Sequence, residues 1–291
     1  MEKISAAIGS ITYAFSAAMI IRLEWNTAGQ VMWWLAINMA LVEYYFERSK
    51  RVAILVPPAI CMLVTAGHFQ TMLYSLVLIL SYTVFKWIGK KRKSEVVLLV
   101  ALGLGLLIGS LQILPTMVMM SKSVRMVESA IARDNYGLLP WGNLIAMWAP
   151  DFFGNPTTIN YWGVINYNET IFYPGLIGLI AVIWGGFNWR KLKGENRFFL
   201  IAALLAILMA FDNPLGRLVY ELKIPFLSTG YAARVLVILI FATSVLTGTW
   251  LEKLRGMNRG ETYLPLILCF MMAIVALGVI VYAKRIFLTE P

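Results

Sequence analysis

The sequence has few charged residues, one histidine and two cysteines, and these shortages exclude several classes of protein. Only 14% of its 291 residues are charged, whereas a soluble domain has about 25%. A single histidine, His68, argues against a metal site built on several imidazoles. Cys61 and Cys269 both stand inside apolar runs, which is typical of small buried side chains and not of a disulfide framework.

The motifs of familiar soluble enzymes are also missing. The chain contains no Walker-type phosphate loop, no dinucleotide fingerprint, no His-Glu-x-x-His and no Cys-x-x-Cys. Intrinsic disorder is excluded as well, because disordered chains have low hydrophobicity. The function has to be sought in another class of protein.

Apolar residues are abundant, at 60% of the chain, and the mean hydropathy is +0.74. A helix needs about 20 apolar residues to cross a bilayer, so this supply fits about nine crossings. We therefore expect an all-α, polytopic transmembrane bundle in which residues 1–291 form a single membrane domain. The predicted spans are Ile4–Ile21, Ala28–Phe46, Val52–Gly67, Thr71–Trp87, Val96–Met119, Ile171–Phe187, Phe198–Phe211, Val235–Leu251 and Tyr263–Tyr282.

The lysines and arginines predict the orientation of these spans. With the N-terminus in the cytoplasm, 16 of the 25 basic residues fall on the inner side and 9 on the outer side, as expected for cytoplasmic loops. This bias explains the net charge of +10 without a nucleic-acid partner. We predict a multi-pass protein of the cell membrane. The basic turn over residues 89–93 either binds anionic lipid or simply stops transfer.

Two predicted outer loops, residues 120–170 and 212–234, are too long to be plain turns. The first is rich in aromatic residues, which concentrate at membrane interfaces. We expect an interfacial helix over Leu138–Phe153 and a turn over Pro150–Thr158. The aromatic side chains either anchor the loop or line a groove for a lipid substrate.

Polar residues at the outer ends of spans are the candidates for chemistry, because charges near the membrane core are unfavourable. His68 and Glu169 are predicted to approach one another, and a carboxylate there would raise the imidazole pKa. A lone histidine can equally be a structural donor. Arg234 either binds an anionic head group or extends its charge into water. Glu43, near an inner end, is expected to reach the cytoplasm.

Five short motifs follow one another along the chain. They are Gly67-His-Phe-Gln-Thr-Met-Leu-Tyr74, Gln112-Ile-Leu-Pro115, Pro150-Asp-Phe-Phe-Gly154, Tyr161-Trp-Gly163 with Asn166-Tyr-Asn-Glu169 and Tyr173-Pro-Gly175, and Ile224-Pro225 with Tyr231-Ala-Ala-Arg234. Together they resemble one family, the YfhO-like bacterial membrane proteins, over about residues 4–284.

This family looks like the GT-C class of glycosyltransferases. The resemblance implies an enzyme that takes a sugar from a polyprenyl-phosphate donor and transfers it to an extracytoplasmic acceptor, such as a cell-envelope polymer or glycan. It implies catalytic roles for Glu169, His68 and Asp151. The lipid-phosphate donor would be bound by Arg234, Gln70 and Tyr231. No metal ligands are assigned, and a divalent cation stays open as a cofactor.

The first outer loop departs from the GT-C pattern. Arg22-Leu-Glu-Trp-Asn-Thr27 contains one carboxylate, where GT-C enzymes usually have an acidic pair. The expectation is that an upstream chain supplies the missing N-terminal spans. The alternatives are a non-catalytic fragment or subunit of such an enzyme, or a transporter or flippase of lipid-linked saccharides.

Overall fold

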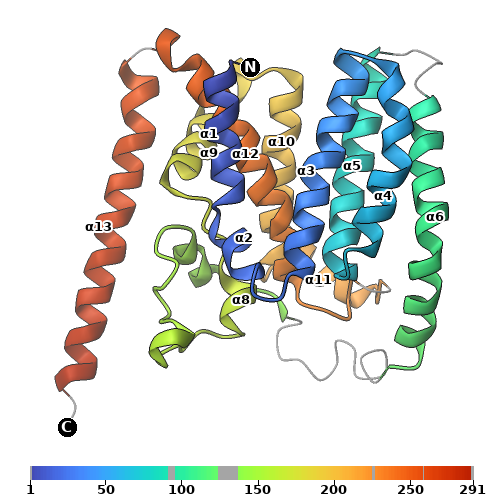
Figure 1. The fold of residues 1–291 in the computed structure, drawn as a ribbon. Coiled ribbons are helices and arrows are strands. Elements are labelled where there is room, and N and C mark those ends of the chain that lie inside the picture. Colours follow the sequence, from blue (N-terminus) through green and yellow to red (C-terminus); the bar gives the residue numbers. More distant parts are fainter. Residues whose placement is uncertain (1, 91–95, 124–136, 225–226, 258, 290–291) are drawn as a thin grey trace.

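The computed structural model describes residues 2–90, 96–123, 137–224, 227–257 and 259–289, and there the chain is all-helical (Figure 1). Helix accounts for 79% of the residues, and the described part has no strand beyond a bridge between Leu139 and Phe211. The predicted all-α class is confirmed. Part of the predicted loop 120–170, part of the loop 212–234 and most of the basic turn 89–93 lie outside the described residues.

Among the described residues, three helical segments are long and apolar enough to cross a membrane. They are α5 (Phe69–Lys90), α6 (Val96–Ser121) and Ala232–Lys253, which joins the 3₁₀ turn η7 (Ala232–Val235) to α12 (Leu236–Lys253). Shorter apolar helices are α9 (Leu176–Phe187) and Thr262–Val275, which lies within α13 (Arg259–Thr289). Large apolar side chains on α6 are exposed, as expected of a surface that faces lipid.

Helices also lie at the other predicted ranges. They are α1 (Lys3–Ala14) with α2 (Ala17–Arg22), α3 (Thr27–Glu47), η1 (Lys50–Leu55) with α4 (Val56–Thr65), and α10 (Gly194–Ala210). Short helical turns occur between them: η4 (Trp141–Met147), η5 (Pro156–Thr158), α8 (Tyr167–Thr170), η6 (Trp189–Lys191), α11 (Pro214–Glu221) and η8 (Leu254–Gly256).

Two helix boundaries differ from the predicted ones for local reasons. The first helix breaks at Phe15–Ser16, where the Ser16 side chain accepts a hydrogen bond from the Met19 N–H and begins α2. The predicted span from Ile171 becomes helical only at Leu176. Pro174 has no N–H, and Gly175 has a φ of 85°, which favours glycine.

The predicted interfacial helix over Leu138–Phe153 is wrong in its extent. Leu139 is extended, and its N–H and C=O bond to Ala210 and Asp212 at the end of α10. The helix can therefore start only after Pro140, and it is the 3₁₀ helix η4. Pro150 disfavours helical backbone in the preceding residue, so turns follow.

The core is centred on α12, which is buried along most of its length and packs against α1, α9 and α10. α5 packs against α3 and α12, and α4 packs against α6. The α4–α6 contact is close because Gly105 has no side chain: a Cβ there would lie 2.6 Å from the Cβ of Ile60. α13 packs against α9 at the edge of the bundle (Figure 1).

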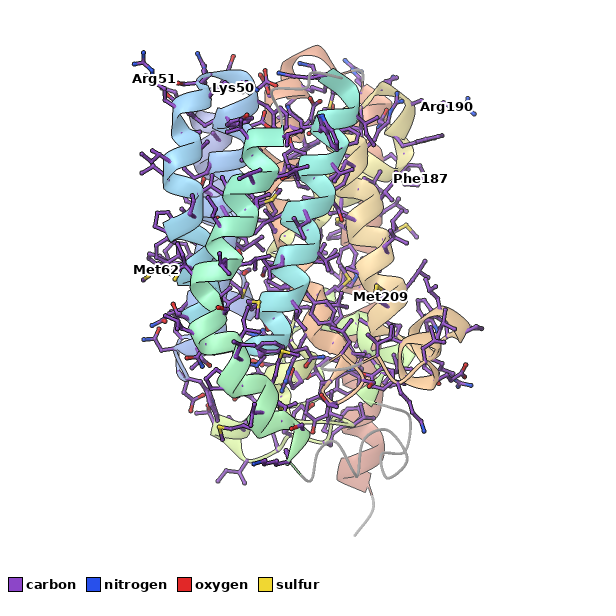
Figure 2. The ribbon with its side chains drawn as sticks, turned by 90° about the vertical axis from the view of Figure 1, so that its right-hand side faces the viewer. Lys50, Arg51, Met62, Phe187, Arg190 and Met209 are labelled. Carbon is purple, nitrogen blue, oxygen red and sulfur yellow. The ribbon has the colours of Figure 1, made fainter. Side chains whose placement is uncertain are left out.

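The bundle has two ends, which we call lower and upper as they are drawn in Figure 1. α8 and α11 lie at the lower end, and the chain begins at the upper end. Lys50, Arg51 and Arg190 lie at the upper end, whereas Met62 is exposed on the side of the bundle (Figure 2). A basic end and apolar sides are the distribution expected of a membrane protein.

Candidate functional site

A group of largely buried polar contacts at the lower end joins Arg234, Glu169 and Gln70, which we call the Arg234 centre. Arg234 Nε donates to Glu169 Oε1 at 2.8 Å, and Nη2 donates to the same oxygen. Arg234 Nη1 donates to Gln70 Oε1 at 3.0 Å. The carboxylate is 10% exposed and the guanidinium side chain 19%, so the ion pair is largely withdrawn from water.

Each member of the centre comes from a different element. Glu169 lies in the single turn α8, which begins where Asn166 Oδ1 accepts the Glu169 N–H at 3.0 Å. Gln70 lies in the first turn of α5, and Arg234 lies in η7. The centre therefore fixes the entry loop of α9 to the beginnings of α5 and α12.

Gln70 and Tyr231 complete the surroundings of the guanidinium. Gln70 Nε2 donates to the Tyr231 carbonyl at 3.1 Å, so the amide nitrogen and the amide oxygen are both hydrogen-bonded. The Tyr231 ring centroid lies 5.4 Å from the Arg234 guanidinium carbon, within the range of a cation–π contact. The three residues predicted to bind lipid phosphate are thus close together, but much of the guanidinium is already engaged by protein groups.

Arg22, which sequence reasoning gave no role, adds a second cation to this region. It lines a small cavity together with Glu169, and its Nη1 donates to the Ala18 carbonyl at 3.1 Å. Glu169 Oε2 is buried and has no hydrogen-bond partner in the described part of the chain. Arg22 could have been found in the sequence as a charged residue directly after an apolar run.

His68 is near the centre but does not pair with Glu169. Its Nδ1 accepts the Thr71 N–H at 3.3 Å, which caps the start of α5. No hydrogen bond or ion pair joins His68 to Glu169 among the described residues. Burial, with the charge of Arg234, lowers the pKa of His68 to about 4, although Glu169 acts in the opposite direction. The expected rise in this pKa is wrong, because burial and two nearby cations outweigh one carboxylate.

Asp151 belongs to a separate polar group in the loop that follows η4. Its Oδ1 accepts from the Tyr167 hydroxyl at 2.5 Å and from Asn155 Nδ2 at 3.0 Å. Burial and the bond to Asp151 raise the pKa of Tyr167. No contact with the Arg234 centre is described for Asp151. Asp151 is connected to the centre through its hydrogen bond to Tyr167, because Tyr167 is the first residue of α8, the turn that carries Glu169.

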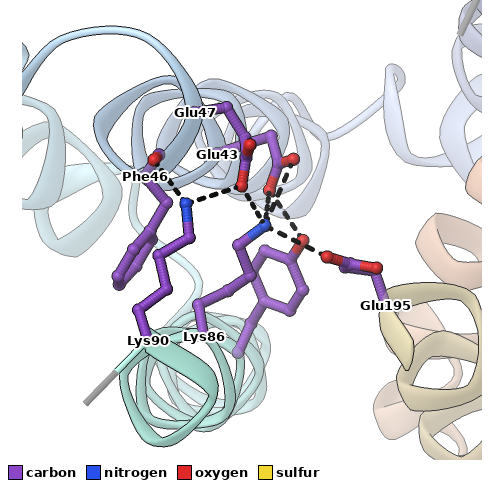
Figure 3. A network of polar contacts seen from close by, with 7 residues as sticks. Glu43, Phe46, Glu47, Lys86, Lys90 and Glu195 are labelled. Atoms are coloured by element: carbon purple, nitrogen blue, oxygen red, sulfur yellow. Dashed lines mark hydrogen bonds and ion pairs between the residues drawn. The ribbon is translucent and has the colours of Figure 1, made fainter. Parts of the chain in front are cut away.

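A second ionic cluster lies at the upper end, around Lys86 (Figure 3). Lys86 Nζ lies 2.8 Å from Glu47 Oε1 and 3.3 Å from carboxylate oxygens of both Glu43 and Glu195. The lysine side chain is 4% exposed, whereas the carboxylates are about half exposed. Tyr82 donates to Glu43 at 2.7 Å. The cluster joins α3, α5 and α10, and sequence reasoning had considered Glu43 only as a solvated group.

In the described residues, no group of three or more His, Cys, Asp or Glu side chains is arranged to hold a metal ion. Comparisons of the chain with protein-family models, with curated proteins and with solved structures gave no match.

Proposed function

We propose that this protein is an integral membrane glycosyltransferase-like enzyme that transfers a sugar from a polyprenyl-phosphate donor to a hydroxyl of an extracytoplasmic acceptor. One observation carries the proposal: a carboxylate that is 10% exposed, held at one oxygen by Arg234, has its other oxygen buried and without a described partner. Such an oxygen is available to a hydroxyl group. The motif resemblance supplies the substrate class.

In this proposal the lower end faces the outside of the cell, and the chain crosses the membrane nine times with its N-terminus in the cytoplasm. The basic upper end supports this orientation. The exposed aromatic side chains of the outer loop support an interfacial location, because Trp141 and Trp162 are exposed there.

The proposed reaction is a displacement at the anomeric carbon of the donor sugar. Glu169 Oε2 takes the proton of the acceptor hydroxyl as the new oxygen–carbon bond forms from the hydroxyl oxygen. The bond from the anomeric carbon to the phosphate oxygen breaks, and its electron pair leaves with the polyprenyl phosphate. A cation near that oxygen stabilises the departing negative charge.

In this proposal Arg234 does more than bind phosphate, which is the role that the sequence predicted for it. Two of its nitrogens hold Glu169 Oε1 and a third holds Gln70. A guanidinium has five N–H groups, so only those left on Nη1 and Nη2 remain for a phosphate. We propose that Arg234 chiefly positions Glu169, and that its remaining N–H groups face the donor phosphate.

The test is sugar transfer in membranes from a radiolabelled polyprenyl-phosphate sugar, with protein amounts matched by blotting. Glu169→Gln keeps the shape and should lower transfer by about 10²–10⁴-fold, the usual contribution of a general base. Arg234→Lys cannot hold both Glu169 and Gln70 and should lower transfer by about 10–100-fold. Arg217 pairs with Asp212 at the same end and is half exposed, so Arg217→Ala is the matched control. Full transfer by Glu169→Gln would contradict the proposal.

Movement of lipid-linked saccharides across the membrane is a second candidate function. It is favoured by Lys86, a buried lysine shared by carboxylates of two other helices, because paired charges within membrane helices mark many transporters. Vesicles with a fluorescent lipid-linked saccharide in one leaflet separate the two functions. A transporter equilibrates the label without forming a new glycosidic bond, whereas the enzyme requires an acceptor.

A further inference from the structure

The cavity beside the Arg234 centre lies between α2, α8 and the start of α12. Its walls are mostly apolar and include Met32, Phe172, Ala233 and Val237. Arg22 and Glu169 are its charged lining residues. Its volume is about 10 Å³, which is room for about one water-sized group.

Glu169 Oε2 requires a partner at this position. The side chain is nine-tenths buried, and Oε2 has no hydrogen bond among the described residues. A buried acceptor left unsatisfied destabilises a protein by roughly 1–3 kcal/mol, and more when it is charged. Buried polar atoms in native proteins are therefore almost always bonded to protein or to an ordered small group.

The chemistry of the cavity selects the kind of group it holds. A phosphate has four oxygens and is too large for this volume. A cation is disfavoured, because Arg22 and Arg234 both stand close to Glu169. A neutral group that both donates and accepts a hydrogen bond fits, since Glu169 accepts and Arg22 donates. A hydroxyl group has these properties and this size.

We propose that the cavity docks a single hydroxyl group, whose O–H donates to Glu169 Oε2 and whose oxygen accepts from the Arg22 guanidinium. Arg22 is then a positioning residue that orients the hydroxyl toward the carboxylate. This proposal rests on the proposed function in one respect, namely that during turnover the hydroxyl belongs to the sugar acceptor. In the resting protein the same place holds a water molecule.

The first experiment is a structure of the full chain in lipid nanodiscs at a resolution that shows ordered water. We expect one oxygen within about 3.2 Å of both Glu169 Oε2 and an Arg22 nitrogen. Ala233→Val adds two methyl groups to the cavity wall and should remove this oxygen. Ala232→Val is the matched control, because Ala232 is buried in the same turn but does not line the cavity. No oxygen in the unaltered protein would overturn the proposal.

The second experiment measures transfer with the acceptor and donor concentrations varied separately. Ala233→Val should lower kcat/KM for the acceptor at least tenfold and leave the KM for the donor unchanged, whereas Ala232→Val should change neither. Val237→Ile, which fills the cavity from α12, should act in the same direction if Ala233→Val does not fold.

Two outcomes separate this inference from the proposed function. An ordered oxygen combined with unchanged acceptor kinetics in both filled variants would identify a structural water only, and would overturn the docking proposal. An ordered oxygen that the filled variants lose, in a protein that transfers no sugar, would support the hydroxyl-sized site and contradict the glycosyltransferase function.

Discussion

His68 is neutral in the folded protein, and its lowered pKa makes the stability depend on pH. Its pKa is about 4 when folded, against 6.5 ordinarily. The folded state therefore binds fewer protons than the unfolded chain between these values. The contribution is fully present above pH 6.5 and is lost as the pH falls toward 4. One pKa unit corresponds to about 1.4 kcal/mol, so the difference between the folded and the unfolded pKa corresponds to a loss of roughly 3 kcal/mol.

Replacing His68 by asparagine should remove this dependence. Asparagine cannot titrate, and its side-chain oxygen can still accept the Thr71 N–H at the start of α5. Thermal unfolding of the detergent-solubilised protein at pH 7, 6, 5 and 4 measures the effect. The unaltered protein should lose stability faster than His68→Asn between pH 6.5 and 4. Parallel curves would show that burial does not hold His68 in its neutral form.

At the scale of elements, the α4–α6 contact depends on Gly105. A Cβ at this position would lie 2.6 Å from Ile60 Cβ and 2.8 Å from the Pro57 carbonyl oxygen. Small residues allow membrane helices to approach closely in this way. Gly103, one half-turn away on the same helix, has no atom within 4 Å of the same position. The two glycines therefore form a matched pair.

Gly105→Val should destabilise the protein by about 1–3 kcal/mol, because it forces α6 away from α4. Gly103→Val carries the same change in helix propensity but meets no neighbour, so its stability should stay near that of the unaltered protein. Thermal unfolding in nanodiscs of one lipid composition compares the two variants. Equal losses of stability would mean that α4 and α6 do not pack at Gly105.

Apolar runs predicted most helices because a membrane helix needs only length and hydrophobicity. The predicted Val96–Met119 is α6, Val96–Ser121, and the predicted Thr71–Trp87 lies within α5. The helix break before Ser16 was missed, although Ser16 is a good N-terminal cap. The outer loop was the least predictable part, because Leu139 pairs with α10, about 70 positions away, and no local pattern signals such a contact.

At the scale of the whole molecule, the sequence named the members of the Arg234 centre but not their pairing. Glu169 was expected beside His68, whereas it bonds to Arg234, which lies in a distant element. Lys86 and Glu195 are similarly far apart in the chain. Such pairs depend on which helices pack against one another. A hydropathy pattern predicts where the chain crosses the membrane, but it does not predict which helices are neighbours.

The orientation of the molecule can be tested with single cysteines at its two ends. Arg51 and Thr157 are both exposed, and they lie on opposite sides of the membrane in the proposed topology. With Cys61 and Cys269 replaced by alanine, Thr157→Cys should react in intact cells with a membrane-impermeant maleimide. Arg51→Cys should react only after the cells are permeabilised. The reverse pattern would require the opposite orientation.

α5 is held by polar contacts near both of its ends. Gln70, in its first turn, bonds to Arg234 and to the Tyr231 carbonyl. Lys86, roughly 24 Å further along the helix, bonds to Glu195 of α10. A large tilt of α5 relative to α10 and α12 would therefore break one of these two sets of contacts while the other remained. A mechanism that opened the two ends in turn would have to break the two sets of contacts in turn. If both sets stay intact, α5 stays in place and only the substrates move.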